Sequence, residues 1–329
     1  MAKSWQSYVF NGLLRLRRRP LVHARQIEKL KRQLAKIDAK RKDSLPSNFT
    51  LKTVHNREQR NGIPVDWLSS TTADHSQRLI LYLHGGAFCL HAPNIYRGFL
   101  AQLCAATSAV GVLPDYRLAP LHPYPAAAFD CFKVYQQLLE QGHDPNNIAI
   151  AGDSAGGNLT LTTLLQIKQN NLPMPACAAM LSPAADATFS GRSYFENAGK
   201  DPMFHVASML FFRDYYLQGA LPTDTLASPL TQSFSGYPPL YASVGSTELL
   251  RDTAVAIAQN ARRDDVDAEL DIWQGTCHVH QLMDFLPESK PAVENIVSFI
   301  NRHWQTAHSS QSLAANTQET GEARQTLVG

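Results

Sequence analysis

A serine that could act as a nucleophile lies in the segment Gly152-Asp153-Ser154-Ala155-Gly156-Gly157. The apolar residues 147–151 before it predict a strand, and the leucines after it recur at helical spacing, so Ser154 is expected at a strand-to-helix corner. Such a corner strains the backbone, and small neighbours let it close without Cβ clashes. We therefore expect the Ser154 hydroxyl to point outward and the Ala155 amide, at the start of the helix, to donate to an oxyanion.

A histidine and an acid follow later strands. Serine is a weak nucleophile until an imidazole accepts its proton, and the imidazole needs an anion to hold its tautomer. His278 follows the last predicted strand and is the expected base, whereas His280 alternates with it along extended chain and should face the other way and pack. Glu248 is the expected acid because it comes soonest after its strand, and Asp252, one helical turn later, is the alternative. The order serine, acid, histidine is that of the α/β hydrolases.

A second glycine-containing segment, His84-Gly85-Gly86-Ala87-Phe88, directly follows a predicted buried strand. Adjacent glycines let backbone amides approach a ligand closely, and the segment has the form of the oxyanion loop of lipases and esterases. We expect Gly85 and Gly86 to donate to an oxyanion together with Ala155. His84 is expected to hold this loop in place through hydrogen bonds.

Strands and helices alternate along most of the chain, which predicts an α/β fold with a mostly parallel central sheet flanked by helices. Strands are predicted over residues 50–54, 63–68, 78–83, 110–113, 147–151, 176–181, 240–244 and 268–273, with a turn at Arg60-Asn61-Gly62. Helices are predicted over residues 23–42, 95–107, 125–141, 203–218, 253–263 and 287–304. Because parallel strands end at one edge, Ser154, Glu248 and His278 are expected to meet there.

The regular alternation of predicted strands and helices is interrupted between residues 184 and 230, a stretch that is rich in aromatic residues. An insertion at the carboxyl edge of an open sheet would cover its ligand site. We therefore expect four segments: a basic helical arm over 1–48 that forms part of a cap, a catalytic domain over 49–183 and 231–307, a helical cap insertion over 184–230, and a disordered tail over 308–329. The predicted pocket residues are Phe88, Met209 and Phe212.

The 329 residues carry a net charge of +2, and this charge is unevenly distributed along the chain. Residues 1–43 hold 13 Lys and Arg against three acids, so their net charge is +10 and that of the remaining chain is −8. Such an arm could lie solvated over the acidic body, or contact anionic lipid through apolar side chains. Nucleic acid is not an expected partner, because few aromatic side chains accompany the basic ones. The residues expected at a lipid surface are Tyr8, Val9, Phe10, Leu13 and Leu14.

The five cysteines are scattered and form no C-x-x-C pair, so we expect neither disulfides nor a metal site. This usage indicates a reducing compartment. No apolar run reaches the roughly 20 residues of a membrane span, and the arginines near the N-terminus follow the apolar stretch rather than precede it, unlike a secretory signal. A cytoplasmic location is therefore expected.

Several motifs, in their order along the chain, resemble those of the bacterial hormone-sensitive-lipase family of carboxylesterases. They are the His84–Phe88 segment, Asp115-Tyr116-Arg117-Leu118-Ala119-Pro120, the Ser154 segment, and the segments around Glu248 and His278. The resemblance covers residues 50–305 and implies an α/β-hydrolase fold with a helical cap. It also implies hydrolysis of short- to medium-chain acyl esters, a homodimer, and no metal or cofactor.

The chain departs from this family at four positions. Ala87 stands where a third glycine is usual, and Leu121 where an acid is usual. Glu248 replaces the more common aspartate, and His280 replaces an aromatic residue. Two other functions stay open. One is a lipase acting on longer-chain esters at interfaces, for which the basic amphipathic arm is the reason, and the other is a non-catalytic binding protein, because the same fold can serve different functions.

Overall fold

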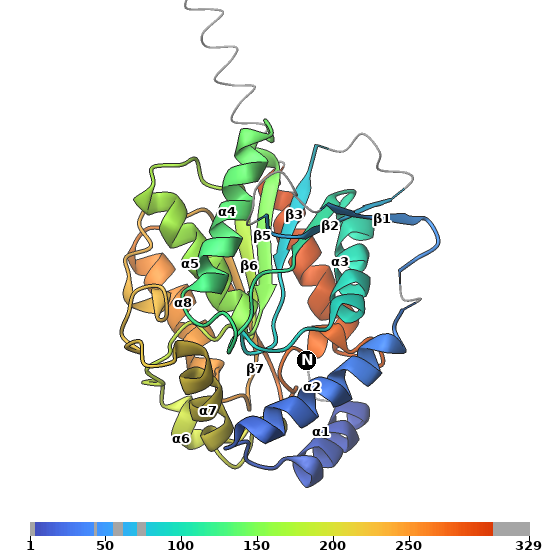
Figure 1. Ribbon diagram of the computed structural model, residues 1–329, viewed down its shortest axis with the longest axis vertical. Coiled ribbons are helices and arrows are strands. Elements are labelled where there is room, and N and C mark those ends of the chain that lie inside the picture. The colour runs from blue at the N-terminus through green and yellow to red at the C-terminus, as the bar shows by residue number, and fades with distance from the viewer. Residues whose placement is uncertain (1–3, 43–44, 55–61, 71–76, 305–329) are drawn as a thin grey trace, which may run out of the picture.

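The computed structural model describes residues 4–42, 45–54, 62–70 and 77–304. The strands within them are β1 (Phe49–Val54), β2 (Val65–Ser70), β3 (Leu79–Leu83), β4 (Val110–Pro114), β5 (Ile148–Asp153), β6 (Cys177–Leu181), β7 (Leu240–Gly245) and β8 (Ala268–Trp273). They form a sheet in the order β1-β2-β4-β3-β5-β6-β7-β8 (Figure 1). The pairs from β4 to β8 are parallel, and β1 and β2 are antiparallel to their neighbours. The predicted fold class is confirmed.

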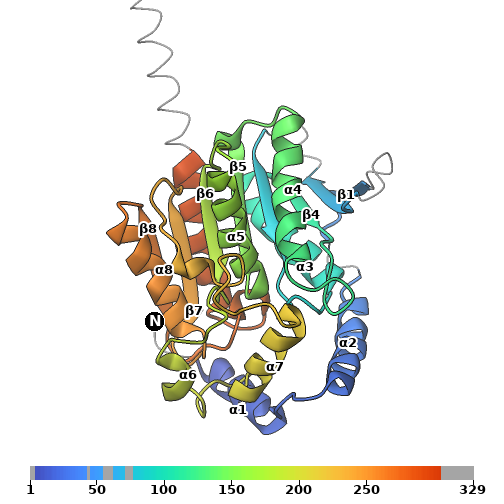
Figure 2. The same ribbon diagram turned by 60° about the vertical axis from the view of Figure 1, so that its left-hand side comes forward.

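Helices connect these strands and cover both faces of the sheet (Figure 2). They are α1 (Trp5–Arg17), α2 (Ala24–Ala39), α3 (Pro93–Thr107), α4 (Ala126–Glu140), α5 (Ala155–Gln169), α6 (Ser193–Glu196), α7 (Val206–Leu217), α8 (Arg251–Arg263) and a helix over residues 289–304. Each predicted helix is present with limits that differ by a few residues. Two predictions, the turn residues Arg60-Asn61 and the tail 308–329, lie outside the described residues.

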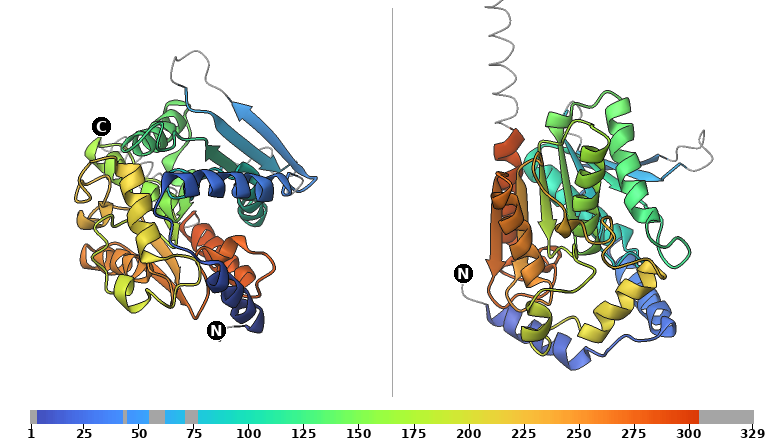
Figure 3. Two further views of the ribbon diagram at one scale, coloured as in Figure 1. Left: turned by 60° about the horizontal axis from the view of Figure 1, so that its bottom comes forward. Right: turned by 90° about the vertical axis from the view of Figure 1, so that its left-hand side faces the viewer.

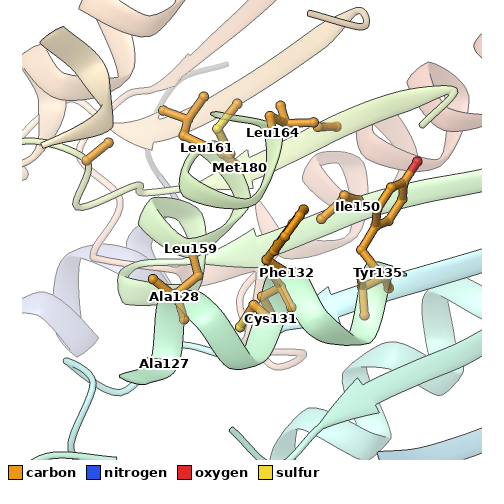
Figure 4. Packing of buried hydrophobic residues seen from close by; sticks show 14 of the residues in the cluster. Ala127, Ala128, Cys131, Phe132, Tyr135, Ile150, Leu159, Leu161, Leu164 and Met180 are labelled. Carbon is orange, nitrogen blue, oxygen red and sulfur yellow. The ribbon is translucent and has the colours of Figure 1, made fainter. Parts of the chain in front are cut away.

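Alternate side chains of the central strands point to opposite faces of the sheet, and each face has its own core. Leu79 and Leu81 of β3 pack in the larger core with α4, α5 and α8, whereas Ile80 and Tyr82 pack against α3 and the helix over residues 289–304. Figure 4 shows the larger core where α4 and α5 meet above β5 and β6. This packing buries α5 on almost all sides, which fixes the residue that precedes it, Ser154.

The four remaining helices, α1, α2, α6 and α7, gather at the end of the molecule where the parallel strands have their carboxyl ends (Figures 1 and 3). Two of them come from the N-terminal arm and two from the insertion after β6. Segments nearly 200 residues apart in the chain therefore lie side by side over the edge that carries the predicted chemistry.

Polar side chains attach α1 to the body of the protein. The Ser4 amide and the Ser7 hydroxyl donate to the carboxylate of Glu288 at 2.6 and 2.8 Å. One turn further on, the Asn11 amide group donates to the Gly275 carbonyl at 2.6 Å. Ser7, Asn11 and Glu288 are all buried, so these hydrogen bonds are shielded from water and fix the helix in one position.

The residues between α1 and α2 form hydrogen bonds with the insertion that follows β6. The Arg18 guanidinium donates to the carbonyl of Asp201 at 2.5 Å, and the Leu21 amide donates to the Ser208 hydroxyl at 2.8 Å. The following helix, α2, ends on α3, where the buried carboxylate of Asp38 accepts the Ile95 amide at 2.9 Å. A carboxylate at a helix N-terminus is stabilised by the helix dipole, so Asp38 caps α3 from another segment.

Candidate active site

Ser154 occupies the corner between β5 and α5 with φ 53° and ψ −116°. A positive φ is strained for a residue with a Cβ, and such strain is typical of functional turns. The Ser154 amide donates to the Leu181 carbonyl of β6 at 2.8 Å, which holds the strained residue. A Cβ at Gly156 would lie 1.8 Å from the Leu83 carbonyl oxygen, and one at Gly152 would lie 2.4 Å from the Gly156 oxygen. Close backbone approach therefore requires both glycines.

His278 and Glu248 are joined directly. His278 Nδ1 lies 2.7 Å from Glu248 Oε2, and both side chains are buried. The other oxygen, Oε1, accepts the Gly245 amide at 2.6 Å and the Ser182 hydroxyl at 2.8 Å. Since a carboxylate can only accept, Nδ1 carries the proton and Nε2 remains available as a base.

The surroundings of His278 also favour its charged form. Burial acts to lower the pKa of His278, but the hydrogen bond and the negative charge of Glu248 outweigh it. The carboxylates of Asp201 and Asp153 act in the same direction, so the pKa is raised above its ordinary value. A cation forming on this ring would therefore be stabilised where a general base requires it.

Asp252, the alternative acid, is engaged elsewhere. Its carboxylate accepts the Ser193 amide at 2.9 Å and pairs with Arg251 at 2.8 Å. These contacts fix the start of α8 against α6. The structure thus brings Glu248, and not Asp252, to the imidazole of His278.

The side chain of His280 packs in the protein interior, as expected. It is fully buried beside the Trp273 ring, with 5.4 Å between ring centroids. Neither ring nitrogen has a hydrogen-bond partner among the described residues. Burial lowers the pKa of His280 to about 4, so the ring is neutral.

The glycine loop after β3 differs from the prediction at one position. The Gly85 amide donates to Asp153 Oδ1 at 2.9 Å, so it is engaged and cannot serve an oxyanion. The prediction for Gly85 is therefore wrong. Within the described part of the chain, the backbone N–H groups of Gly86, Ala87 and Ala155 have no hydrogen-bond acceptor. Ala87 and Ala155 line the same cavity as Ser154.

Asp153, directly before the serine, holds this loop from inside the protein. Its Oδ1 accepts both the Gly85 amide and the Tyr82 hydroxyl, each at 2.9 Å. Burial raises the pKa of Asp153 to about 6, although these hydrogen bonds and the charge of His278 oppose that shift. Asp153 thus couples the serine corner to the glycine loop.

His84 holds the loop from its other side, which confirms the prediction. Its Nδ1 lies 2.7 Å from the Gly85 oxygen, and its ring stacks on Tyr116 with 4.2 Å between centroids. The Tyr116 hydroxyl donates to the His84 carbonyl at 2.7 Å. Burial lowers the pKa of His84 to about 3, so the ring is neutral and plays a structural part.

A cavity of about 580 Å³, part of it open to solvent, lies over Ser154. The three predicted residues, Phe88, Met209 and Phe212, all line it. Its walls are mainly apolar, and α7 supplies much of one side. The remaining residues of the wall are Ala87, Ala155, Asn158, Ala184, Asp186, Ala187, Phe189, Phe204, Arg213, Tyr216, Leu217 and Ala227.

Two residues near the site were not predicted. Ser182 is fully buried and, besides donating to Glu248, accepts the Val279 amide at 3.2 Å. Phe204 lines the cavity and meets the His278 ring edge to face at 4.8 Å. The signal for Ser182 was a polar residue directly after a buried strand, at the edge where Ser154, Glu248 and His278 also follow their strands.

The five cysteines are buried and unpaired. Among the described residues, no three His, Cys, Asp or Glu side chains are grouped so that they could hold a metal ion. In the same part of the chain, no helix has the length and apolar character needed to cross a membrane.

Comparisons with known proteins agree with this geometry. A family model described as the alpha/beta hydrolase fold matches residues 80–282. An acetyl-hydrolase of Streptomyces hygroscopicus is 34% identical over 236 residues, which are 71% of this chain and 78% of the relative. A crystal structure of an esterase from the bacterial hormone-sensitive lipase family superposes with a TM-score of 0.82 at 32% identity, covering 92% of this chain and 100% of that chain. The esterase EstE5, in a crystal soaked with p-nitrophenyl butyrate, superposes with a TM-score of 0.82 at 31% identity, covering 92% and 99%.

Proposed function

This chain belongs to the bacterial hormone-sensitive-lipase family of α/β hydrolases and is a carboxylesterase, and we propose that it cleaves short- to medium-chain acyl esters with Ser154, His278 and Glu248 as its catalytic triad. The observation that carries this assignment is the 2.7 Å hydrogen bond between the buried His278 and Glu248. Serine at the strained corner supplies the nucleophile. As a carboxylesterase, the chain is not the non-catalytic binding protein considered above.

The proposed reaction runs through an acyl-enzyme. His278 Nε2 accepts the proton of Ser154 as the hydroxyl attacks the ester carbonyl, and the resulting imidazolium is stabilised by Glu248. We assign the oxyanion hole to the amides of Gly86, Ala87 and Ala155, because the Gly85 amide is occupied by Asp153. His278 then protonates the leaving alcohol, and water repeats both steps on the acyl-enzyme.

The cavity and the relatives support the proposed substrate class. The apolar wall beside Ser154 suits an acyl chain better than a charged group. One relative is named an acetyl-hydrolase, and crystals of a similar esterase were soaked with a butyryl ester. We therefore propose acyl groups in this range for the protein, with the alcohol part of the ester toward solvent.

The helical arm and the insertion, residues 1–48 and 184–230, are proposed to form one cap. Support comes from the hydrogen bonds that Arg18 and Leu21 make with the insertion. The insertion residues Met209 and Phe212 would then determine how much acyl chain the site accepts. A homodimer, which the family resemblance implies, stays a prediction.

A series of p-nitrophenyl esters from acetyl upward tests the proposal. We expect the rate to be highest for short and medium chains, and Ser154→Ala to lower kcat by a factor on the order of 10³ or more. Labelling with a fluorophosphonate should modify the native protein and not the variant. Turnover of emulsified long-chain triglyceride in preference to soluble esters would instead support the lipase alternative.

A further inference from the structure

Helix α1 is amphipathic, but its polar face lies against the protein and its apolar face is exposed. Ser7 and Asn11 are each 1% exposed, whereas Trp5 is 72% and Leu16 is 83% exposed. A helix that only packs on its own protein buries its apolar face and exposes the polar one. Here the outer face is a stripe at helical spacing, which we call the α1 stripe; it consists of Trp5, Tyr8, Val9, Leu13 and Leu16.

The inward direction of the polar face is fixed by specific partners. Ser7 donates to Glu288, and Asn11 donates to the Gly275 carbonyl. Turning α1 to bury the stripe would break these hydrogen bonds and leave the buried Glu288 carboxylate without them, which is costly. The exposure of the α1 stripe is therefore a stable feature of the fold.

The exposed residues of α1 differ in part from those expected at a lipid surface. Phe10 was expected at a lipid surface, but its ring packs edge to face on Phe285 with 5.0 Å between centroids. Leu14 is half-buried, and Trp5 and Leu16, which were not predicted, are the outermost apolar residues of the helix.

Basic residues surround the α1 stripe. By helical position, Arg15 and Arg17 lie on its two flanks, and both are exposed. The arm as a whole, residues 1–43, carries a net charge of +10. Figure 3 shows that α1 lies at the same end of the molecule as α2 and α7, which is the cap end.

We propose that the α1 stripe docks on an anionic lipid surface, with α1 lying in the interface. Aromatic and aliphatic side chains on one face with arginines beside them are the chemistry of an interfacial helix, and anionic lipid is complementary to the charge of the arm. A second copy of the chain fits less well, because a symmetric dimer across α1 would bring two arms of charge +10 together. The C-terminal residues 305–329 are mostly polar and offer no matching apolar stretch.

Docking of α1 would turn the cap end, and with it the cavity over Ser154, toward the lipid. Acyl esters dissolved in the membrane could then enter beneath α7 without crossing bulk water. This consequence rests on the proposed function, whereas the docking itself does not depend on hydrolysis.

Vesicle flotation with the full-length chain tests the docking. We expect binding to vesicles of phosphatidylcholine with about 30 mol% phosphatidylglycerol, little binding to pure phosphatidylcholine, and release at about 0.5 M salt. The triple variant Trp5→Ser, Val9→Ser, Leu16→Ser should bind at least about tenfold more weakly. Leu121→Ser removes an equally exposed leucine outside α1 and should bind normally.

Hydrolysis of soluble p-nitrophenyl butyrate should be unchanged in both variants, since none of these residues lines the cavity, and this confirms that they fold. Trp5 emission should shift to the blue on binding, a change that Trp5→Phe should remove. Failure of the wild-type protein to float with anionic vesicles, or equal flotation of the triple variant, would overturn the proposal. A dimer in light scattering that the triple variant abolishes would assign the stripe to a second copy instead.

Discussion

The substitution Glu248→Gln tests the triad at its acid. Oε1 of Glu248 accepts hydrogen bonds from the Gly245 amide and the Ser182 hydroxyl, so the carbonyl oxygen of the introduced glutamine should occupy that position. The amide nitrogen would then face His278 Nδ1 in place of Oε2, which now lies 2.7 Å away. Because that nitrogen can only donate, Nδ1 must accept and the proton moves to Nε2. The imidazole could then no longer accept the serine proton.

The expected loss in kcat is on the order of 10³ to 10⁴, the cost of holding a catalytic histidine in the wrong tautomer. The pH dependence should change as well. Glu248 raises the pKa of His278, and the base is active only when neutral, so activity of the native protein falls as the pH drops through that raised pKa. Without the carboxylate the pKa of His278 should be lower, and the acid limb should move to lower pH.

The assay is kcat/KM for p-nitrophenyl butyrate from about pH 5 to about pH 9, with the active-site concentration determined by burst titration. Asp252→Asn is the matched control, since it removes a carboxylate from the same segment and should retain most activity. Retention of more than about a tenth of the activity by the Glu248 variant, or a larger loss in the Asp252 variant, would refute the assignment.

Three further predictions follow from contacts around the site. Ser182→Ala removes one hydrogen bond to Glu248, the proposed triad acid, and should lower kcat about tenfold or more with little change in KM. Ser243→Ala removes a hydroxyl that accepts from the neutral Gln281 side chain, so it should lower stability without this effect on kcat. Gly156→Ala should prevent stable folding, because the new Cβ would overlap a carbonyl of β3, while Gly12→Ala, with nothing within 4 Å, should leave the melting temperature unchanged or raise it. Burial acts to raise the pKa of Glu288, but hydrogen bonds from the arm outweigh it and lower the pKa. The contribution of Glu288 to stability is therefore present above the unfolded pKa of about 4.5 and lost as the pH falls through the folded pKa. Tryptic cleavage of the arm at pH 8 should be faster in Glu288→Ala than in the native protein.

The local elements around the chemistry could be predicted because each depends on a short stretch of sequence. A β-prone run, a serine between glycines and a leucine-rich helix are contiguous, so the corner at Ser154 follows from residues 147–165 alone. The position of Glu248 three residues after the end of β7 likewise distinguished it from Asp252, which lies in the first turn of α8. These predictions needed only the rule that parallel strands end at one edge.

The prediction for Gly85 failed because it depended on a partner from another strand. The residue types show which amides could donate, but not which are already engaged. Asp153 ends β5, and its carboxylate reaches the loop after the neighbouring β3, where it takes the Gly85 amide. The sequence shows an acid next to Ser154, but the direction of its side chain is set by the pairing of β3 with β5.

The direction of α1 could be predicted only in part. Tyr8, Val9 and Leu13 were expected to face outward, toward lipid, but the inward position of Ser7 and Asn11 was not expected. Periodicity shows that a helix has two faces and, in most proteins, that the apolar one is buried. In α1 the buried face is chosen instead by Glu288 and Gly275, which lie more than 260 residues away in the chain and supply the partners of Ser7 and Asn11. Local sequence carries no information about such partners.

These distant partners also connect the arm to the catalytic segments. Gly275, which accepts from Asn11, lies three residues before His278 on the same loop. Arg18 donates to the carbonyl of Asp201, and the carboxylate of Asp201 accepts the amide of Leu249, next to Glu248, at 2.9 Å. Hydrogen bonds from α1 and from Arg18, the residue after it, therefore support both the loop that carries His278 and the segment that carries Glu248.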